Sequence, residues 1–224
     1  MGVFTNTKSK AQSFETLVGL TTVLILIYLL TLSSVGSVVT GMMQLAPDKG
    51  FRVWTIVTYM FVHTDIVHLL SNLIMLWIGF MLIHHSRRKF FIPLFIIGGI
   101  SGGIGYMVSE SAGVPIIGSS NGVAAILASA IMFPNGRNFN RYSFRLLAIV
   151  LLLFALSGNI CSYPVLFGHL SGAMGGFIVS VFIFIILKFR KNNKRLSRTD
   201  KENIINKIRT SGYASLTDEE RKLL

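Results

Sequence analysis

The sequence of 224 residues has little cysteine and little charge. A single cysteine, Cys161, excludes an internal disulfide. Charged residues make up 13% of the chain, about half the share found in soluble domains, whereas 52% of the residues are hydrophobic. The apolar residues form several long runs. This composition excludes an ordinary soluble domain and predicts an all-α protein that crosses a membrane several times.

Acidic residues are also scarce, and the excess of basic residues gives a formal net charge of +12. Such a balance raises nucleic acid or an anionic surface as a partner. The basic residues lie in short polar segments between apolar runs, so we expect the lipid bilayer as a partner and no nucleic acid. Lys8 and Lys10 precede the first apolar run, and no small-residue cleavage pattern follows it. We therefore predict a retained span and not a removed signal peptide.

Six apolar runs are predicted to span the membrane. They cover about residues 17–35, 67–83, 90–108, 116–133, 146–160 and 165–187. The predicted domains are a cytoplasmic N-terminus at residues 1–15, a six-helix membrane domain at residues 16–188 and a basic cytoplasmic tail at residues 189–224. Between the first two spans, about residues 36–66 are expected to form an interfacial loop with an amphipathic element.

The tail is expected to form a small helical pair. Gly212 suits a helix stop, and Thr217-Asp218-Glu219-Glu220 predicts a capping box that opens a short last helix.

The distribution of lysine and arginine predicts the orientation. If six helices cross, 19 of the 21 basic residues lie on one side, and the other two are Lys49 and Arg52. Positive residues favour the cytoplasmic side, so both termini are expected in the cytoplasm. The second, fourth and sixth spans then run inward from the outer face.

Three of the polar residues in the predicted spans share one depth. His68, Ser120 and His169 lie near the starts of the three inward-running spans, one or two turns below the outer surface. Ionisable residues in a membrane are costly and mark functional sites. A serine hydroxyl needs a neighbouring base to accept its proton, and His169 is the candidate base for Ser120.

Glycines provide the means to bring these residues together. Gly168, Gly172 and Gly176 recur every four residues and form a smooth helix face, and Gly118 and Gly122 offer a small pair on the fourth span. We expect the fourth and sixth spans to pack closely there.

His68 and Asn72 lie one turn apart on one face of the second span. Together with the backbone N–H of Ser120, their side chains suit the oxyanion that develops in acyl transfer.

Taken singly, the serine and histidine residues in the predicted spans also have simpler interpretations. A membrane serine commonly bonds to its own helix backbone, and a membrane histidine often belongs to an interhelical bond or a proton relay. His63, His68 and His169 are compatible with zinc, although no cysteine or carboxylate accompanies them at helical spacing, and we expect no metal or other cofactor.

The combination of motifs resembles the rhomboid intramembrane serine proteases. The resemblance rests on His63-x4-His68-x3-Asn72, Gly118-Ser119-Ser120 and Gly168-His169-x2-Gly172, and it covers about residues 50–185. It implies a six-helix rhomboid-like bundle with a catalytic dyad of Ser120 and His169, assisted by His68 and Asn72. It also implies cleavage of single-span membrane proteins near the outer face without metal or nucleotide. The compact six-span core suits a bacterial plasma membrane.

Two positions depart from the family pattern. Asn121 stands where the family usually has glycine, and Ala124 stands where it often has an aromatic residue. These departures motivate a first alternative, a catalytically inactive relative that binds membrane helices. A second alternative is a proton or ion transporter that uses the histidines and Asn72. The apolar inner halves of the three marked spans argue against a conducting path.

Overall fold

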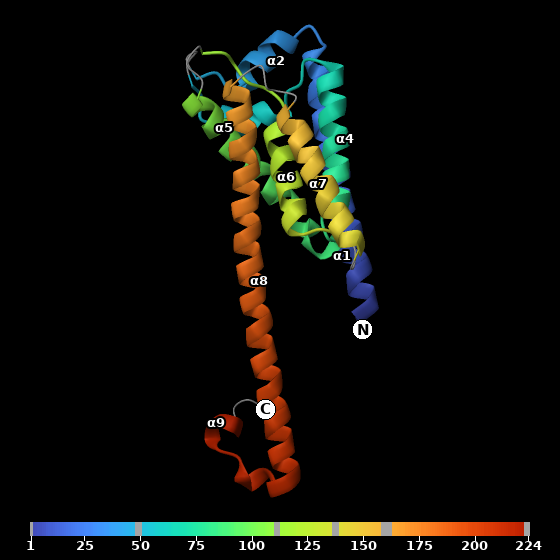
Figure 1. Ribbon diagram of the computed structural model, residues 1–224, viewed down its shortest axis with the longest axis vertical. Helices are drawn as coiled ribbons and strands as arrows, with labels where there is room; N and C mark the ends of the chain where they lie inside the picture. Colours follow the sequence, from blue (N-terminus) through green and yellow to red (C-terminus); the bar gives the residue numbers. More distant parts are fainter. Residues whose placement is uncertain (1, 48–50, 110–112, 136–138, 158–162, 222–224) are drawn as a thin grey trace. The chain divides into compact units, whose positions relative to one another are not determined.

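The computed structural model describes residues 2–47, 51–109, 113–135, 139–157 and 163–221, and all the regular elements in these ranges are helical. In chain order they are α1 (Gly2–Thr31), α2 (Gly36–Met43), α3 (Thr55–Thr58), η1 (Tyr59–Phe61), α4 (Ile66–Leu82), η2 (His85–Phe90), α5 (Phe91–Ser109), α6 (Ser120–Met132), α7 (Phe139–Ser157), α8 (Tyr163–Ser211), η3 (Tyr213–Ser215) and α9 (Asp218–Arg221) (Figure 1). The chain divides into two compact units, Met1–Ser180 and Val181–Leu224, with the division inside α8.

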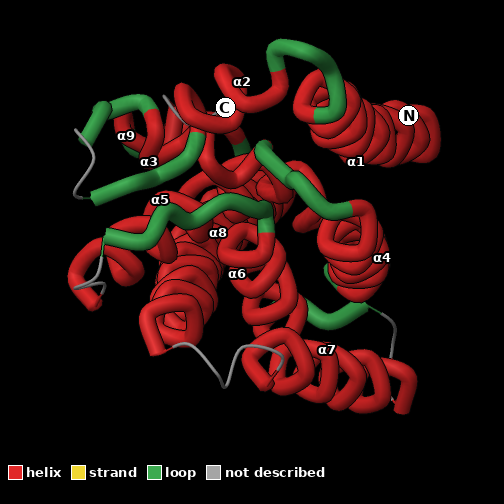
Figure 2. The backbone as a smooth tube through the Cα atoms, turned by 90° about the horizontal axis from the view of Figure 1, so that it is seen from above, coloured by secondary structure: helices red, strands yellow, loops and turns green. Residues whose placement is uncertain are grey.

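Helix α6 is the centre of the first unit. It contacts α4, α5 and α7, and Figure 2 shows these helices and the start of α8 around it. Every residue from Asn121 to Ala130 is buried. Most of these residues have small side chains, which allow neighbouring backbones to come close without a large apolar core.

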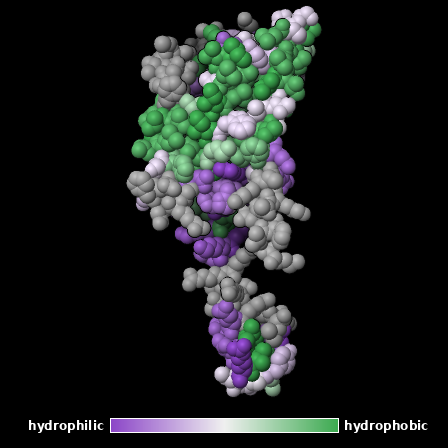
Figure 3. Space-filling view, turned by 90° about the vertical axis from the view of Figure 1, so that its right-hand side faces the viewer, coloured by the Kyte–Doolittle hydropathy of each residue, from purple (hydrophilic) through white to green (hydrophobic). Residues whose placement is uncertain are grey.

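The outer faces of the first unit are apolar. Large side chains such as Leu29, Ile74 and Ile178 are exposed, and hydrophobic residues cover much of the visible surface of this unit in Figure 3. Apolar surface on this scale indicates contact with lipid. Within the described residues, three helices are long and apolar enough to cross a membrane, or up to four if the bent pair Thr55–Phe61 and Ile66–Leu82 is one span.

The predicted helices and the observed helices differ most at the start of α6. We expected a helix from about residue 116, but α6 begins at Ser120. Ile116 instead forms an antiparallel bridge with Leu45, with N–O distances of 2.8 and 3.1 Å. Gly118 then has a φ of 109°, which a right-handed helix excludes. The residues before Ser120 therefore form an extended approach to the helix.

The first predicted span is also too long at its end. Helix α1 stops at Thr31, and Gly36 starts α2 after a tight turn in which its α-carbon lies against the Thr31 carbonyl. A Cβ at position 36 would overlap that carbonyl, so the turn requires glycine.

The end of the segment at residues 36–66 lies inside the bundle and not on an interfacial surface. Tyr59, Met60, Val62 and His63 are all fully buried. The hydroxyl of Tyr59 donates to the Gly99 carbonyl of α5 at 2.6 Å, and Thr31 donates to the His63 carbonyl at 3.0 Å. These bonds satisfy backbone carbonyls that have no access to water.

The second unit partly matches the expected tail. Helix α8 runs from the sixth predicted span into the predicted tail as far as Ser211, and Gly212 ends it with a φ of 77°. The capping box is confirmed: the Thr217 N–H donates to Glu220 at 2.8 Å, and the Glu220 N–H donates to the Thr217 hydroxyl at 3.2 Å. Ile204 and Leu216 are buried within this unit.

Candidate active site

Ser120 is the first residue of α6, directly after the turn at Gly118 and Ser119. The Gly118 N–H donates to the Tyr59 carbonyl at 3.0 Å, which ties the turn to the buried segment before α4. The first N–H groups of a helix have no carbonyl one turn earlier to bond. The Ser120 N–H is one of these groups, so it is placed to bind an oxygen at the helix start.

The side chain of Ser120 meets His169 of α8. Ser120 Oγ lies 2.7 Å from His169 Nε2, the serine is half-buried and the histidine is buried. A ring nitrogen at this distance can accept the hydroxyl proton when the oxygen attacks a carbonyl. For that role Nε2 must be unprotonated and Nδ1 must carry the ring proton.

Glycines of α8 allow this close approach, as the sequence predicted. A Cβ built at Gly172 would lie 2.6 Å from the carbonyl oxygen of Asn121, and one built at Gly176 would lie 2.5 Å from that of Ala125. Both obstructing atoms belong to the backbone of α6 and cannot move aside. The distance between Ser120 and His169 therefore depends on glycine at these positions.

Gly118 and Gly122, which were predicted to pack against the sixth span, face other helices. Gly122 faces Phe95 of α5, because a Cβ there would lie 2.7 Å from the phenylalanine ring. Gly118 faces the His68 ring, because a Cβ built at Gly118 would lie 2.5 Å from Cε1 of that ring. The expected pairing of these two glycines with α8 is wrong, since the turn before α6 points Gly118 at α4 and the helix points Gly122 at α5.

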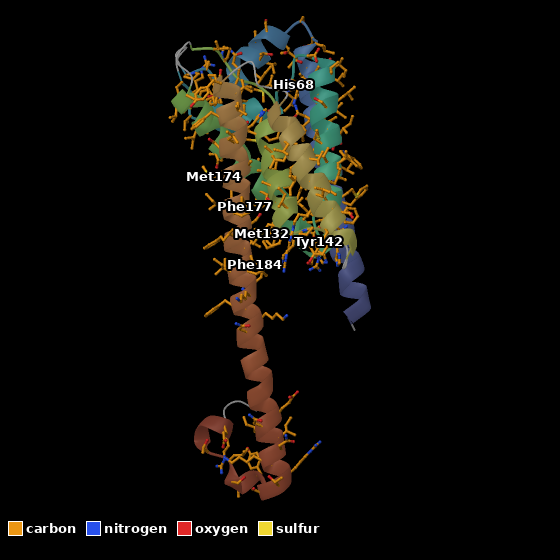
Figure 4. All side chains as sticks on the ribbon, in the orientation of Figure 1. His68, Met132, Tyr142, Met174, Phe177 and Phe184 are labelled. Carbon is orange, nitrogen blue, oxygen red and sulfur yellow. The ribbon has the colours of Figure 1, made fainter. Side chains whose placement is uncertain are left out.

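His68 lies beside the turn that presents the serine. Its backbone N–H donates to Asp65, the N-cap of α4, at 2.8 Å. Figure 4 shows His68 at the end of the bundle where α4 and α8 begin. This position puts an imidazole next to Gly118, two residues before Ser120.

Asn72 follows His68 by one turn and is buried. Its Nδ2 atom donates to the His68 carbonyl at 3.0 Å and lies 3.3 Å from His63 Nε2. Both amide hydrogens therefore have neighbours within the protein. Donation to a third acceptor would use the hydrogen of the longer contact, the one with His63.

His63 is fully buried and forms a second serine–histidine contact. Its Nε2 atom lies 3.3 Å from both the backbone nitrogen and the hydroxyl of Ser119. Because the Ser119 N–H and Asn72 Nδ2 are donors, Nε2 is the accepting nitrogen and Nδ1 carries the ring proton. The rings of His63 and His68 are 5.0 Å apart. His63 thus connects the start of α6 to α4.

The two unusual positions both lie in helix contacts. Ala124 packs with Ala128 of α6 and Ala173 of α8. Asn121 is buried, and its amide points to Tyr59. Cys161 lies outside the described residues, and among those that are described no group of three His, Cys, Asp or Glu side chains could hold a metal ion.

Sequence reasoning missed the parts that Ser119, Asp65 and Tyr59 take in this arrangement. An acidic residue directly before the apolar run that begins at Ile66 is a recognisable N-cap signal. No pattern in the sequence connects Ser119 to His63 or Asn121 to Tyr59, because each pair spans more than 50 residues.

Comparison with known proteins relates this chain to one family. The model of the rhomboid domain family matches residues 50–186. Rhomboid-related protein 3 from Homo sapiens is 26% identical over 159 residues, which cover 61% of this chain and 38% of the human protein. Since the family match covers more than half of the chain, this protein belongs to the rhomboid family, a family of intramembrane serine proteases.

Proposed function

We propose that this protein is an intramembrane serine endopeptidase that cleaves single-span membrane proteins near the outer membrane face. The observation that carries the proposal is the 2.7 Å contact between Ser120 Oγ and His169 Nε2 at the start of α6. Membership of the rhomboid family supports it. No metal or other cofactor takes part in the proposed reaction.

In the first half of the reaction, Ser120 Oγ attacks the carbonyl carbon of the scissile peptide bond. His169 accepts the hydroxyl proton as the new C–O bond forms. The tetrahedral intermediate then breaks its C–N bond, and the same proton passes from His169 to the leaving amine. The products are the free amine and an ester between the substrate and Ser120.

The negative oxygen of the intermediate needs donors that are already in position. We assign this role to the Ser120 N–H, to the His68 ring and to the amide of Asn72. The first is oriented by the helix, and the second lies against Gly118. Asn72 contributes by releasing its 3.3 Å contact with His63.

In the second half of the reaction, a water molecule attacks the ester carbon. His169 takes one proton from the water and returns it to Ser120 Oγ when the ester bond breaks. The released product carries a carboxyl group and the enzyme returns to its initial state. Water has to reach the site, which fits a position near the outer face.

The proposal includes six crossings, with both termini in the cytoplasm and the starts of α4, α6 and α8 towards the outside. In Figure 1, these three helices begin at the same end of the first unit. The distribution of basic residues supports the orientation. The cytoplasmic membrane of a bacterium is the proposed location.

A catalytically inactive rhomboid-like protein that binds membrane helices is the second candidate. It is motivated by Asn121 and Ala124, which replace the usual glycine and aromatic residue around the serine. Such a protein would use the same bundle to hold a transmembrane helix without cutting it.

The test uses the full chain in liposomes with a single-span substrate and, in parallel, a fluorophosphonate probe. Wild type should cleave the substrate and react covalently with the probe, and Ser120→Ala and His169→Ala should lose cleavage by at least about 1,000-fold. Equal cleavage by all three proteins would contradict the assignment. Binding of the substrate without cleavage or labelling would favour the inactive relative.

Ser119→Ala is the matched control, because it removes the same hydroxyl from the neighbouring residue. Ser119 is fully buried and its backbone bond to His63 does not need the side chain. We expect this variant to keep labelling and cleavage. If Ser119→Ala abolished labelling and Ser120→Ala did not, the assignment of Ser120 as the nucleophile would be wrong.

A further inference from the structure

Asn121 follows Ser120 directly, and its buried side chain starts a chain of two hydrogen bonds. Asn121 Nδ2 donates to the Tyr59 hydroxyl at 2.8 Å. The Tyr59 hydroxyl donates to the Gly99 carbonyl at 2.6 Å. Both side chains are fully buried. The bonds therefore link the first turn of α6 through η1 to the backbone of α5.

The direction of these bonds determines how the Asn121 amide is turned. A phenol has one hydrogen, and the Gly99 carbonyl can only accept, so the Tyr59 hydroxyl must accept from Asn121. The nitrogen of the amide consequently faces Tyr59. The amide oxygen has no donor within the described part of the chain. A buried acceptor in this state lowers stability, so stability alone does not account for the asparagine.

The same side chain fills the space between α5 and α8 beside the proposed base. A Cβ built at Gly102 of α5 would lie 2.5 Å from Asn121 Cγ. One built at Gly168 of α8 would lie 3.5 Å from both terminal atoms of the amide. Gly168 immediately precedes His169. Asn121 is thus joined directly to Ser120 in the chain, and its amide lies close to Gly168, the residue before His169.

We propose that Asn121 and Tyr59 act together as positioning residues for Ser120 and His169, an inference that rests on the proposed function. The side chain of Asn121 sets the distance between α5 and α8, and Tyr59 holds that side chain against α5. The pair keeps Ser120 Oγ within reach of His169 Nε2. Neither residue touches the substrate, because both are buried.

The test measures covalent labelling of Ser120 by the fluorophosphonate in the full-length protein. Each time course gives a final extent, which reports correctly folded protein, and a rate constant, which reports the geometry of the site. The variants are Tyr59→Phe, which removes one oxygen, and Asn121→Leu, which keeps the volume but cannot donate. Both should reach the wild-type extent with rate constants lower by about 10- to 100-fold.

Tyr106→Phe is the matched control, since it removes the hydroxyl of another buried tyrosine, which donates to the Val114 carbonyl at 2.7 Å. Its rate constant should equal that of the wild type. With a peptide-bond substrate, Tyr59→Phe should lower kcat and leave KM unchanged, because a positioning residue affects the transition state and not substrate binding.

Three results would overturn the inference. Wild-type rate constants in both Tyr59→Phe and Asn121→Leu would show that the pair does not position the serine, while the proposed function stands. A lower extent at an unchanged rate constant would assign the pair a role in folding only. A wild type that does not label, or a Ser120→Ala variant that labels equally, would remove the proposed function and the inference with it.

Discussion

At the scale of single residues, the proposed chemistry depends on the contrast between Ser119 and Ser120. The two neighbours have the same side chain, but the turn at Gly118 gives them different histidine partners. Ser119 is enclosed with His63, whereas Ser120 is half-buried and 2.7 Å from His169. A buried hydroxyl cannot meet a substrate. Under the proposed function, the turn therefore leaves Ser120 and not Ser119 accessible to a substrate.

Gly118→Ala should disrupt this turn. Its φ of 109° is unfavourable for alanine by about 1–3 kcal/mol, and the new methyl group would also overlap the His68 ring. We expect a lower unfolding temperature and slower labelling of Ser120. Thermal unfolding in detergent and the fluorophosphonate time course measure the two effects.

Gly19→Ala in α1 is the control for Gly118→Ala, because a Cβ at position 19 would have no neighbour within 4 Å. Alanine favours the helix there by about 0.5–1 kcal/mol, so this variant should be as stable as the wild type or more so. A Gly118→Ala protein that behaves like Gly19→Ala would contradict the account of the turn.

At the scale of helices, the hydrophobic pattern predicts where α4 and α5 lie to within one or two residues, because apolar runs there end at charged or polar segments. It fails at the start of α6. The apolar residues Ile116 and Ile117 continue the run, but a bridge to Leu45 holds that segment extended. A partner 71 residues away cannot be read from local hydrophobicity.

The short last helix α9 should depend on pH through Glu220. Hydrogen bonds from Lys207 and from Thr217 lower the pKa of the Glu220 carboxyl below its ordinary value. A lowered pKa means that the stabilising charged form is present above the ordinary value and is lost as pH falls through the lower one. Hydrogen-exchange protection factors for residues 212–221 should therefore stay constant from neutral pH down to the ordinary glutamate pKa of about 4.3 and be lower at an acidic pH well below that value.

Glu220→Gln provides the comparison for the pH experiment. It keeps an oxygen that can accept from Thr217 but loses the ion pair with Lys207, which has an N–O distance of 2.8 Å. Protection in this variant should be lower at neutral pH and should change little on acidification. A wild type with the same protection at both pH values would refute the role of the carboxylate.

At the scale of the whole molecule, the number of crossings depends on more than helix length. Helix α6 has 13 residues and is about 20 Å long, shorter than the hydrocarbon core of about 30 Å. Its neighbours in the bundle bury it, so it does not have to match the lipid. A short buried helix is compatible with the six crossings that the basic residues favour.

The proposed orientation predicts the accessibility of single cysteines. In a Cys161→Ser background, Arg52→Cys should react with a membrane-impermeant maleimide from outside intact cells, since Arg52 is exposed and lies on the side with few basic residues. Ser86→Cys, exposed next to the basic segment after α4, should react only after the membrane is opened. Reaction of both from the same side would exclude an odd number of crossings between them.

The sequence by itself determined the membrane class, the predicted orientation and the residues of the candidate dyad. Apolar runs are local properties, and the motifs containing Ser120 and His169 are specific in combination. Helical periodicity also placed His68 and Asn72 on one face of α4.

Only the tertiary structure decided what each face contacts. In it, Gly122 packs against Phe95 of α5 and not against α8. Ser119 contacts His63, and Asn121 donates to Tyr59. Periodicity determines the direction in which a side chain leaves its own helix, but the neighbour it meets depends on how the other helices pack. That packing is set by close backbone contacts between residues distant in the sequence.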